Sequence, residues 1–274
     1  MASSSFPYKK VLMVGGTSGI GEGLAVKFVS QGISVIVVGR RQEKLDSFVK
    51  THGSDKASSS VFDVSELSKI PSWAKKIHEQ HPDLDCVVLN QGVQRGFDFS
   101  KPDTVDLSVV NEEFTTNYLA VLHLTNAFLP FLQEQSKKSP AAIMFTTSGL
   151  ALIPMIRCAN YCASKAALHH YILALREQLK DGPGDVKCIE LFPPAVQTEL
   201  HDTKHQPDIK DGGKIGIPLD EYVEETWKGL SAGKEQVPVG TSAGPFSPDG
   251  FETKRQEAFF GMKKMVDSVM AKHF

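Results

Sequence analysis

Short apolar runs alternate with amphipathic stretches along most of this chain of 274 residues, and this alternation restricts the folds that it can adopt. Nearly continuous apolar runs are typical of strands in a parallel sheet that is covered on both faces. Strands that alternate with helices favour a doubly wound α/β architecture. We therefore predict an α/β fold built on one parallel sheet. The predicted strands are residues 11–14, 35–38, 60–62, 86–89, 142–146, 186–192 and 237–239.

The amphipathic stretches between these runs predict the helices. In residues 19–31, for example, Ile20, Leu24 and Phe28 recur at nearly helical spacing. The helix predicted over residues 111–133 contains Pro130, which should kink or stop it because proline has no N–H group to donate. Residues 201–217 are polar and rich in Gly, Lys and Asp, which predicts a mobile loop. One further helix is predicted through Leu45 and Val49, and another is marked by Ile70, Trp73 and Ile77. Three more are predicted over residues 160–180, 220–230 and 251–270.

Composition and charge argue against several classes of protein. The chain is 41% hydrophobic and 23% charged, which is typical of a globular protein. A net charge of −2 gives no broad positive surface for nucleic acid or an anionic membrane. The first ten residues lack the apolar core of a secretory signal, the last four carry no lipidation or retention motif, and no apolar run approaches the roughly 20 residues of a membrane span. We expect a cytoplasmic protein with neither nucleic acid nor membrane as a partner.

Three glycines, Gly15, Gly19 and Gly21, lie where the first predicted strand leads into the first predicted helix. Glycine allows the tight turn, and its missing side chain lets the backbone approach a pyrophosphate at the helix N-terminus. The pattern predicts a dinucleotide-binding loop, with a structural turn that holds no ligand as the alternative. The loop residues assigned to the cofactor are Gly15, Thr17, Ser18, Gly19, Ile20 and Gly21.

The second predicted strand ends in a pair of arginines, Arg40 and Arg41. In dinucleotide folds an acidic residue at this place binds the adenosine ribose 2′-hydroxyl, whereas an arginine suits a 2′-phosphate. A guanidinium group can bind phosphate through two parallel hydrogen bonds. We predict NADP(H) as the cofactor, with Arg40 as the main contact and Arg41 in support. A solvated surface pair is the alternative.

Tyr161 and Lys165 are one helical turn apart and therefore share a helix face. A carbonyl group that accepts hydride develops negative charge on its oxygen and needs a proton. A phenol, with an ordinary pKa of about 10, becomes a useful acid–base catalyst when a nearby cation stabilises its phenolate. Ser148 lies 13 residues before Tyr161, at the end of a predicted strand, where its hydroxyl can hold a substrate carbonyl. The three side chains predict proton chemistry at a carbonyl or alcohol.

The order and spacing of these motifs resemble the short-chain dehydrogenase/reductase family. Asp63 after the third strand, Asn90 and Gly92 after the fourth, and Asn117 in the long helix extend the resemblance, which covers residues 9–200. It implies a Rossmann-type sheet in a single domain over residues 1–274. That domain would contain the core for cofactor binding and catalysis over residues 9–200, a substrate loop over 199–218, and C-terminal helices and a loop over 219–274.

The resemblance also implies a role for each of these residues. Tyr161 would be the general acid in reduction and the base in oxidation, and Lys165 would lower its pKa and bind the nicotinamide ribose. Ser148 would orient the substrate. Asn117 would hold a water that links Lys165 to solvent, unless it only bonds to the backbone inside its helix.

Further cofactor contacts follow from the same resemblance. Asp63 would contact the adenine and Asn90 would bind near the ribose. Thr198 would contact the nicotinamide carboxamide, unless it only caps its loop. The complete set of cofactor contacts outside the glycine loop is Arg40, Arg41, Asp63, Val64, Asn90, Gly92, Tyr161, Lys165, Pro193, Val196 and Thr198.

Several positions depart from the family pattern. Val14 replaces the usual threonine before the first glycine, and Leu89 and Gln91 alter the usual Asn-Asn-Ala-Gly segment. Pro194 replaces a glycine and removes a backbone donor. We expect these departures to alter the nicotinamide pocket and leave the fold intact.

The expected activity is the interconversion of a carbonyl compound and an alcohol, mainly as a reductase. Leu150, Leu152, Ile153 and Met155, between Ser148 and Tyr161, favour a hydrophobic small-molecule substrate if they are not simply core residues. The alternatives are a non-redox isomerase or cyclase on the same fold, or an NADP(H)-sensing protein without catalysis. The resemblance further implies a homodimer or homotetramer that associates through the two long helices.

The remaining histidines and cysteines receive structural interpretations. His169 and His170 are predicted to lie on the helix surface. The four cysteines show no zinc-type spacing, so we predict no metal site and reduced, buried thiols. Cys158 and Cys162 flank Tyr161 and are assigned to packing, with redox sensitivity as the alternative.

Overall fold

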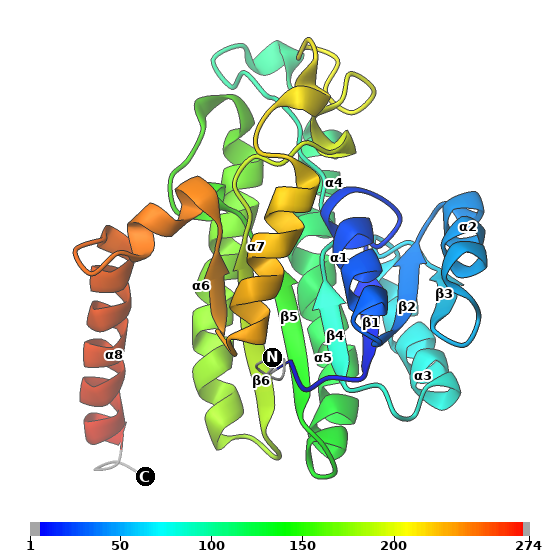
Figure 1. The fold of residues 1–274 in the computed structure, drawn as a ribbon. Coiled ribbons are helices and arrows are strands. Elements are labelled where there is room, and N and C mark those ends of the chain that lie inside the picture. The colour runs from blue at the N-terminus through cyan, green and yellow to red at the C-terminus, as the bar shows by residue number, and fades with distance from the viewer. Residues whose placement is uncertain (1–5, 271–274) are drawn as a thin grey trace.

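The computed structural model describes residues 6–270. Within this range, seven parallel strands form one sheet in the order β3-β2-β1-β4-β5-β6-β7 (Figure 1). The strand order reverses between β1 and β4, and the carboxyl ends of strands at such a switch point form the usual ligand crevice. The predicted Rossmann-type α/β fold is confirmed. The strands are β1 (Lys10–Val14), β2 (Ser34–Gly39), β3 (Ala57–Val61), β4 (Cys86–Leu89), β5 (Ala141–Thr146), β6 (Val186–Phe192) and β7 (Gln236–Pro238).

Helices cover both faces of the sheet. One buried cluster joins the sheet to α1, α2 and α7, and a second joins the opposite face to α3, α5 and α6. Alternate residues of β1 serve the two clusters, because Val11 and Met13 face the first and Leu12 and Val14 the second. The helices are α1 (Gly19–Ser30), α2 (Gln42–His52), α3 (Ile70–Gln80), α4 (Leu107–Phe114), α5 (Ala120–Ser136), α6 (Ala159–Asp181), α7 (Leu219–Ser231) and α8 (Phe251–Met270).

The third strand begins earlier than predicted. We placed it at residues 60–62, whereas β3 covers Ala57–Val61 and ends before Phe62. Its sequence, Ala-Ser-Ser-Ser-Val, lacks an apolar run because β3 is an edge strand that pairs only with β2. An edge strand with one partner leaves alternate side chains near solvent, so its pattern is weak.

The long helix predicted over residues 111–133 is divided, and the division does not occur at the proline. A π-helical segment, Thr115–Leu119, joins α4 to α5. Of the two effects predicted for Pro130, a kink or a stop, the stop was wrong, because α5 continues to Ser136. Leu132, two residues beyond the proline, is buried in the second core cluster, and this packing offsets the hydrogen bond lost at the proline. The π-helical segment contains Asn117, and such segments occur often at functional sites.

Helix α8 projects from the body of the molecule and is anchored through its first turn (Figure 1). Glu252 is fully buried, whereas Met262 and Met265 farther along are exposed. Glu252 bonds to His169 Nε2 at 3.1 Å, and His169 Nδ1 bonds to Glu190 of β6 at 2.8 Å. The surface position predicted for His169 was therefore wrong, although His170 is exposed. The first turn of α8 thus contacts α6 at a residue more than 80 positions earlier in the sequence.

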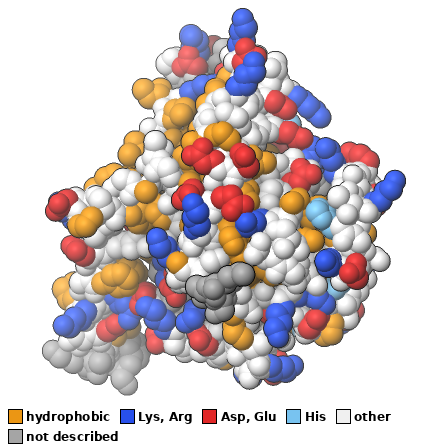
Figure 2. Space-filling model, viewed as in Figure 1, with side chains coloured by type: hydrophobic (Ala, Val, Ile, Leu, Met, Phe, Trp, Pro, Cys, Tyr) orange, Lys and Arg blue, Asp and Glu red, His pale blue; other side chains and the backbone are white. Residues whose placement is uncertain are grey.

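Charge on the molecular surface is mixed. Figure 2 shows lysine and arginine side chains interspersed with aspartate and glutamate over the face that it presents. No helix within residues 6–270 has both the length and the apolar character needed to cross a membrane. Residues 1–5 and 271–274, which belong to the terminal segments assessed above for targeting signals, lie outside the described range.

The buried histidine network predicts a pH-dependent stability. Burial by itself would lower the pKa of His169, but hydrogen bonds with Glu190 and Glu252 raise it to about 9. Charged His169 therefore contributes stability that is complete below its unfolded pKa of about 6.5 and is lost as pH rises through about 9. In urea unfolding, His169→Gln should lower the free energy of unfolding relative to wild type, and this loss should be roughly 2 kcal/mol larger at pH 6 than at pH 9.5. Arg255 also contacts the His169 ring and pairs with Glu252.

His170→Gln is the matched control, because this neighbouring side chain is exposed. It should show the same free energy of unfolding relative to wild type at both pH values. An equal loss for His169→Gln at pH 6 and pH 9.5 would contradict the assignment of a charged, buried histidine.

Candidate active site

The predicted catalytic residues converge at the carboxyl end of β5. Lys165, on the first turns of α6, is 3% exposed, and its Nζ donates a hydrogen bond of 2.8 Å to the carbonyl oxygen of Thr146. Burial lowers the pKa of Lys165 to about 8, and the negative charge of Glu113 opposes this shift. Lys165 Nζ lies 5.8 Å from the centre of the Tyr161 ring. The cation is thus fixed beside the phenol that it was predicted to assist.

Tyr161 is buried and lies close to the side chain of Ser148. Burial raises the pKa of the phenol, and the neighbouring Ser148 hydroxyl opposes this rise. The predicted effect of Lys165 on the pKa of Tyr161 remains a prediction. The Ser148 oxygen also accepts a hydrogen bond of 3.1 Å from the backbone of Leu150, which fixes its position at the strand end.

Asn117 is fully buried and engaged by protein groups. Its Oδ1 accepts from the Val93 N–H at 2.9 Å, and its Nδ2 donates to the Val93 carbonyl at 2.9 Å and to Ser164 Oγ at 3.1 Å. These bonds hold the segment after β4 against α6. A Cβ atom on Gly92 would lie 3.5 Å from both Asn117 Oδ1 and Lys165 Nζ, so both side chains lie next to this glycine. The water relay remains a prediction.

The glycine loop forms a cradle that admits no added side chain. Gly15 has a φ of +78°, and a Cβ on Gly21 would lie 2.1 Å from the Gly15 carbonyl oxygen. Asn90 Nδ2 donates to that carbonyl at 3.3 Å, while Asn90 Oδ1 accepts from Thr146 Oγ1 at 2.9 Å. Asn90 thus connects the glycine loop to the strand that precedes Ser148.

Both arginines lie beside this loop, with different partners. Arg40 is mostly exposed and approaches Asp63 at 3.6 Å. Arg41 donates to Thr17 O at 3.1 Å and to a carboxylate oxygen of Glu199 at 2.7 Å. Two guanidinium groups therefore stand next to the predicted adenosine end of the loop, and Glu199 was not among the predicted site residues.

The other predicted cofactor contacts either lie next to the site or are buried in the structure around it. Thr198 lies against the loop, because a Cβ on Gly19 would be 3.1 Å from its side chain. Pro193 supports the site from behind, since its carbonyl accepts from the Gly149 N–H at 2.9 Å. Val196 is buried and pairs with Ile217 in an isolated bridge. Val64 and Ile20 are partly buried against the two cores.

Gln91 supports binding of a polar ligand at this place. It is 7% exposed, and among the described residues its side-chain amide has no hydrogen-bond partner on either its nitrogen or its oxygen. Leaving such a group unsatisfied costs about 1–3 kcal/mol. Its backbone lies directly beneath Gly15, where a Cβ would approach Gln91 Cα to 2.8 Å. The cradle, the arginine pair and this orphaned amide fit a nicotinamide dinucleotide.

Glu113 is a site residue that sequence reasoning missed. It is 1% exposed, and it accepts hydrogen bonds from Arg95 N at 2.6 Å and Asn160 Nδ2 at 2.8 Å. Burial raises the pKa of Glu113 to about 7, against the opposing effect of the Asn160 hydrogen bond. Its position four residues before Asn117 places it on the same helical face, and that spacing was the available signal.

The predicted substrate loop is folded back onto the site. Arg157 pairs with Asp208 at 2.6 Å, and Gln206 donates to Gln94 Oε1 at 3.0 Å. The loop contains two short helical turns, Glu199–His201 and Gly212–Lys214. These contacts connect it to the start of α6 and to the segment after β4, on the side of the molecule that carries Tyr161.

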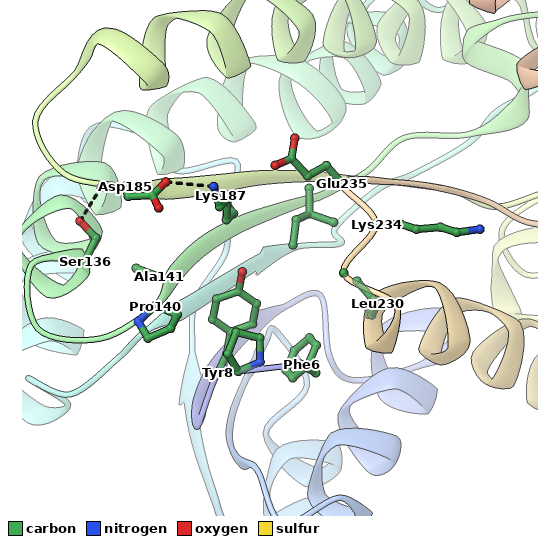
Figure 3. Close-up of a pocket in the computed structure, with 13 residues that line it drawn as sticks. Phe6, Tyr8, Ser136, Pro140, Ala141, Asp185, Lys187, Leu230, Lys234 and Glu235 are labelled. Carbon is green, nitrogen blue, oxygen red and sulfur yellow. Dashed lines mark hydrogen bonds and ion pairs between the residues drawn. The ribbon is translucent and has the colours of Figure 1, made fainter. Parts of the chain in front are cut away.

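A separate cavity lies at the other end of the strands (Figure 3). It has a volume of about 430 Å³ and is lined by Tyr8, Ala141, Leu230 and Glu235, among others. Ala141 begins β5 and Glu235 precedes β7, so the cavity opens at the amino ends of the sheet. The predicted catalytic residues follow the carboxyl ends of the strands, so the candidate active site is at that end and not at this cavity.

Comparison with known proteins identifies the family. Residues 9–208 match the family model for short chain dehydrogenase, and the chain belongs to the short-chain dehydrogenase/reductase family. It is 37% identical to the oxidoreductase DltE of Bacillus subtilis, over 83% of this chain and 86% of that protein. It is also 28% identical to the benzil reductase IRC24 of Saccharomyces cerevisiae, over 74% and 75% of the two chains.

Solved structures share the fold. A short-chain dehydrogenase from Sphingobium yanoikuyae in complex with NADPH aligns with a TM-score of 0.75, at 19% identity and with 95% of each chain covered. A short-chain dehydrogenase/reductase from Burkholderia phymatum in complex with NAD aligns with a TM-score of 0.73, at 20% identity and with 85% and 89% covered. The chain is thus an oxidoreductase of a family that uses nicotinamide cofactors, and its structural neighbours bind both kinds.

The close contact at Gly21 predicts the effect of a single methyl group. Gly21→Ala would place a carbon 2.1 Å from the Gly15 carbonyl oxygen, which only a backbone shift can relieve. We expect a loss of about 1–3 kcal/mol in free energy of unfolding, together with loss of nucleotide binding. Gly244→Ala is the control, because no atom lies within 4 Å of the added carbon. Equal thermal stability and equal nucleotide affinity in both variants would show that the loop is not closely packed.

Proposed function

We propose that the protein is an NADP(H)-dependent reductase that interconverts a ketone or aldehyde and an alcohol, with a hydrophobic substrate. The observation that carries this proposal is the convergence of Tyr161 and Ser148, with Lys165 fixed beside the phenol ring, at the carboxyl ends of the strands next to the glycine cradle. A proton donor, an oxygen-binding hydroxyl and a cation therefore surround one point beside a dinucleotide site.

The nicotinamide, when bound, supplies or accepts the hydride. Ser148 holds the substrate oxygen in place through its hydroxyl, whose position is fixed by Leu150 N–H. Tyr161 donates the phenolic proton to that oxygen in reduction and receives it back in oxidation. Lys165, with an ammonium anchored on Thr146, stabilises the phenolate that forms. The buried surroundings of Tyr161 exclude water and strengthen these interactions.

The preference for NADP(H) over NAD(H) rests on Arg40 and Arg41. Both follow β2 beside the glycine loop, where they replace the acidic residue that would bind a ribose 2′-hydroxyl. Arg41 is already oriented by Thr17 at the N-terminus of α2, where the helix dipole adds attraction for an anion. These features favour a 2′-phosphate.

The hydrophobic substrate is supported by the segment between Ser148 and Tyr161. Ile153 and Met155 are 56% and 48% exposed, and Leu150 and Leu152 are partly buried, so none of the four is an ordinary core residue. Apolar side chains left open next to a polar catalytic group are typical of a pocket for a small apolar ligand. The likeness to a benzil reductase agrees with an aromatic ketone as a first test substrate.

Removing the phenolic hydroxyl provides the direct test of the proposal. Tyr161→Phe should lower the rate of NADPH oxidation at 340 nm with benzil and related ketones by at least about 100-fold, because the proton donor is gone. NADPH affinity should change little, since the ring stays. Tyr171→Phe, farther along the same helix, is the matched control and should keep full activity. Turnover of a carbonyl compound with no change at 340 nm would favour the non-redox alternative.

The arginines predict the cofactor preference. In isothermal titration, Arg40→Ala and Arg41→Ala should each weaken NADPH binding by about tenfold or more, through loss of charged hydrogen bonds, and leave NADH binding nearly unchanged. Glu199→Gln should strengthen NADPH binding several-fold, because the carboxylate competes with phosphate for Arg41. Glu224→Gln removes a similar pair with Lys27 elsewhere and serves as the control. Equal losses in affinity for NADPH and NADH would show that the arginines stabilise the structure and do not select the 2′-phosphate.

A further inference from the structure

Two of the four thiols lie outside the main cores and next to Tyr161. Cys158 and Cys162 form a small buried cluster with Tyr161, against which Leu150 packs. Cys86 and Cys188, by contrast, are strand residues within the two large cores. All four cysteines are free. The pair therefore belongs to the wall of the active site, and its chemistry acts on the catalytic turn.

The two sulfur atoms are already close together. Cys158 Sγ and Cys162 Sγ are 3.8 Å apart and lie one helical turn from each other, with Tyr161 between them in sequence. Positions four apart on an α-helix have Cα atoms about 6 Å apart, within the range that a disulfide spans. Cys158 is the N-cap of α6, with φ −122° and ψ 50°, so it can move without breaking a helical turn.

The surroundings of Cys162 favour a thiolate. The N–H of Met155 donates to its sulfur at 3.3 Å, and the residue lies in the first turns of α6, where the helix dipole stabilises an anion. The contact with Cys158 lowers the pKa of Cys162 to about 6, against the effect of burial. Cys162 is 3% exposed, and Met155, which contacts it, is 48% exposed. The buried sulfur is thus in contact with the backbone of a residue whose side chain reaches the surface.

We propose that Cys158 and Cys162 form an oxidation site at which a hydroperoxide converts the two thiols into a disulfide and stops turnover. The Cys162 thiolate attacks the peroxide oxygen, which gives a sulfenic acid and hydroxide. The Cys158 thiol then attacks that sulfur, and water leaves as the S–S bond forms. Overall, two thiols and one hydrogen peroxide yield one disulfide and two waters, and a dithiol reverses the change.

The disulfide acts through the turn that carries Tyr161. Cβ atoms four residues apart on a helix are about 5–6 Å apart, whereas a disulfide needs about 3.5–4.5 Å. The turn from 158 to 162 must therefore tighten, which displaces the phenol relative to Ser148. The glycine loop and the arginines lie on other elements, so nucleotide binding persists. The inhibitory part of this inference rests on the proposed reductase function, whereas formation of the disulfide does not.

Trypsin digestion places the four cysteines in three separate peptides. Cleavage after Arg157 and Lys165 leaves Cys158 and Cys162 together in the peptide 158–165, while Cys86 and Cys188 fall in other peptides. After treatment of the folded protein with a few equivalents of hydrogen peroxide and then iodoacetamide, this peptide should be about 2 Da lighter and carry no alkyl group. The other two cysteines should be alkylated once each after unfolding, and dithiothreitol should restore the 158–165 thiols.

Variants connect this chemistry to activity. NADPH oxidation with a ketone should fall at least tenfold after peroxide and recover with dithiothreitol, while NADPH affinity changes less than twofold. Cys162→Ala and Cys158→Ala should each lose this reversible inactivation, and the Cys86→Ala/Cys188→Ala double variant should keep it. If a variant fails to fold, the peptide masses of the wild type decide. Fully alkylated Cys158 and Cys162 after peroxide would overturn the proposal, whereas a formed disulfide with no activity in the reduced protein would overturn only the reductase function.

Discussion

The catalytic arrangement depends on one buried hydrogen bond, between the Lys165 ammonium and the carbonyl oxygen of Thr146. A charge that is 3% exposed requires a firm partner, and this bond supplies it while fixing α6 across the end of β5. Ser148 follows Thr146 by two residues, and Tyr161 precedes Lys165 by one helical turn. Because the strand end and the helix are joined at this point, the Ser148 hydroxyl and the Tyr161 phenol are held on the same side of the junction.

Other polar contacts extend this junction in both directions. Toward the cofactor side, Thr146 Oγ1 bonds to Asn90, which in turn holds the carbonyl of Gly15. Toward the C-terminus, Thr147 Oγ1 donates to Glu190 at 2.9 Å, and Glu190 bonds to His169. The segment that ends in Ser148 is therefore held by the glycine loop on one side and by the buried charges beneath α8 on the other. This explains why residues remote in sequence converge on a few atoms of β5.

Much of the fold could be predicted from the sequence, because buried parallel strands and amphipathic helices leave strong local patterns. Cys86–Leu89 and Val186–Phe192 were predicted with the observed bounds, since both strands are buried for nearly their whole length. The serine-rich edge strand β3 and the helix that continues through Pro130 were predicted poorly, because sheet position and tertiary packing decide them. His169 was misplaced for a similar reason, since its buried surroundings come from β6 and from α8.

The candidate site divides in the same way. Motif spacing indicated Tyr161, Lys165, Ser148 and the glycine loop, and the structure brings these residues together at one end of the sheet. Hydrogen bonds between distant segments could not be predicted. They join Arg41 to Glu199, Asn160 to Glu113, and Asn117 to the Val93 backbone. Each is a long-range polar bond with no local periodicity, so only the folded chain reveals it.

The most direct test of the central claim follows the hydride itself. The purified protein is incubated with NADPH that carries deuterium at the transferable position of the nicotinamide C4, together with an aromatic ketone, and the products are examined by NMR. We expect one deuterium on the carbinol carbon of the alcohol for each NADP⁺ formed. A product that carries no deuterium, formed while the labelled NADPH remains intact, would contradict it.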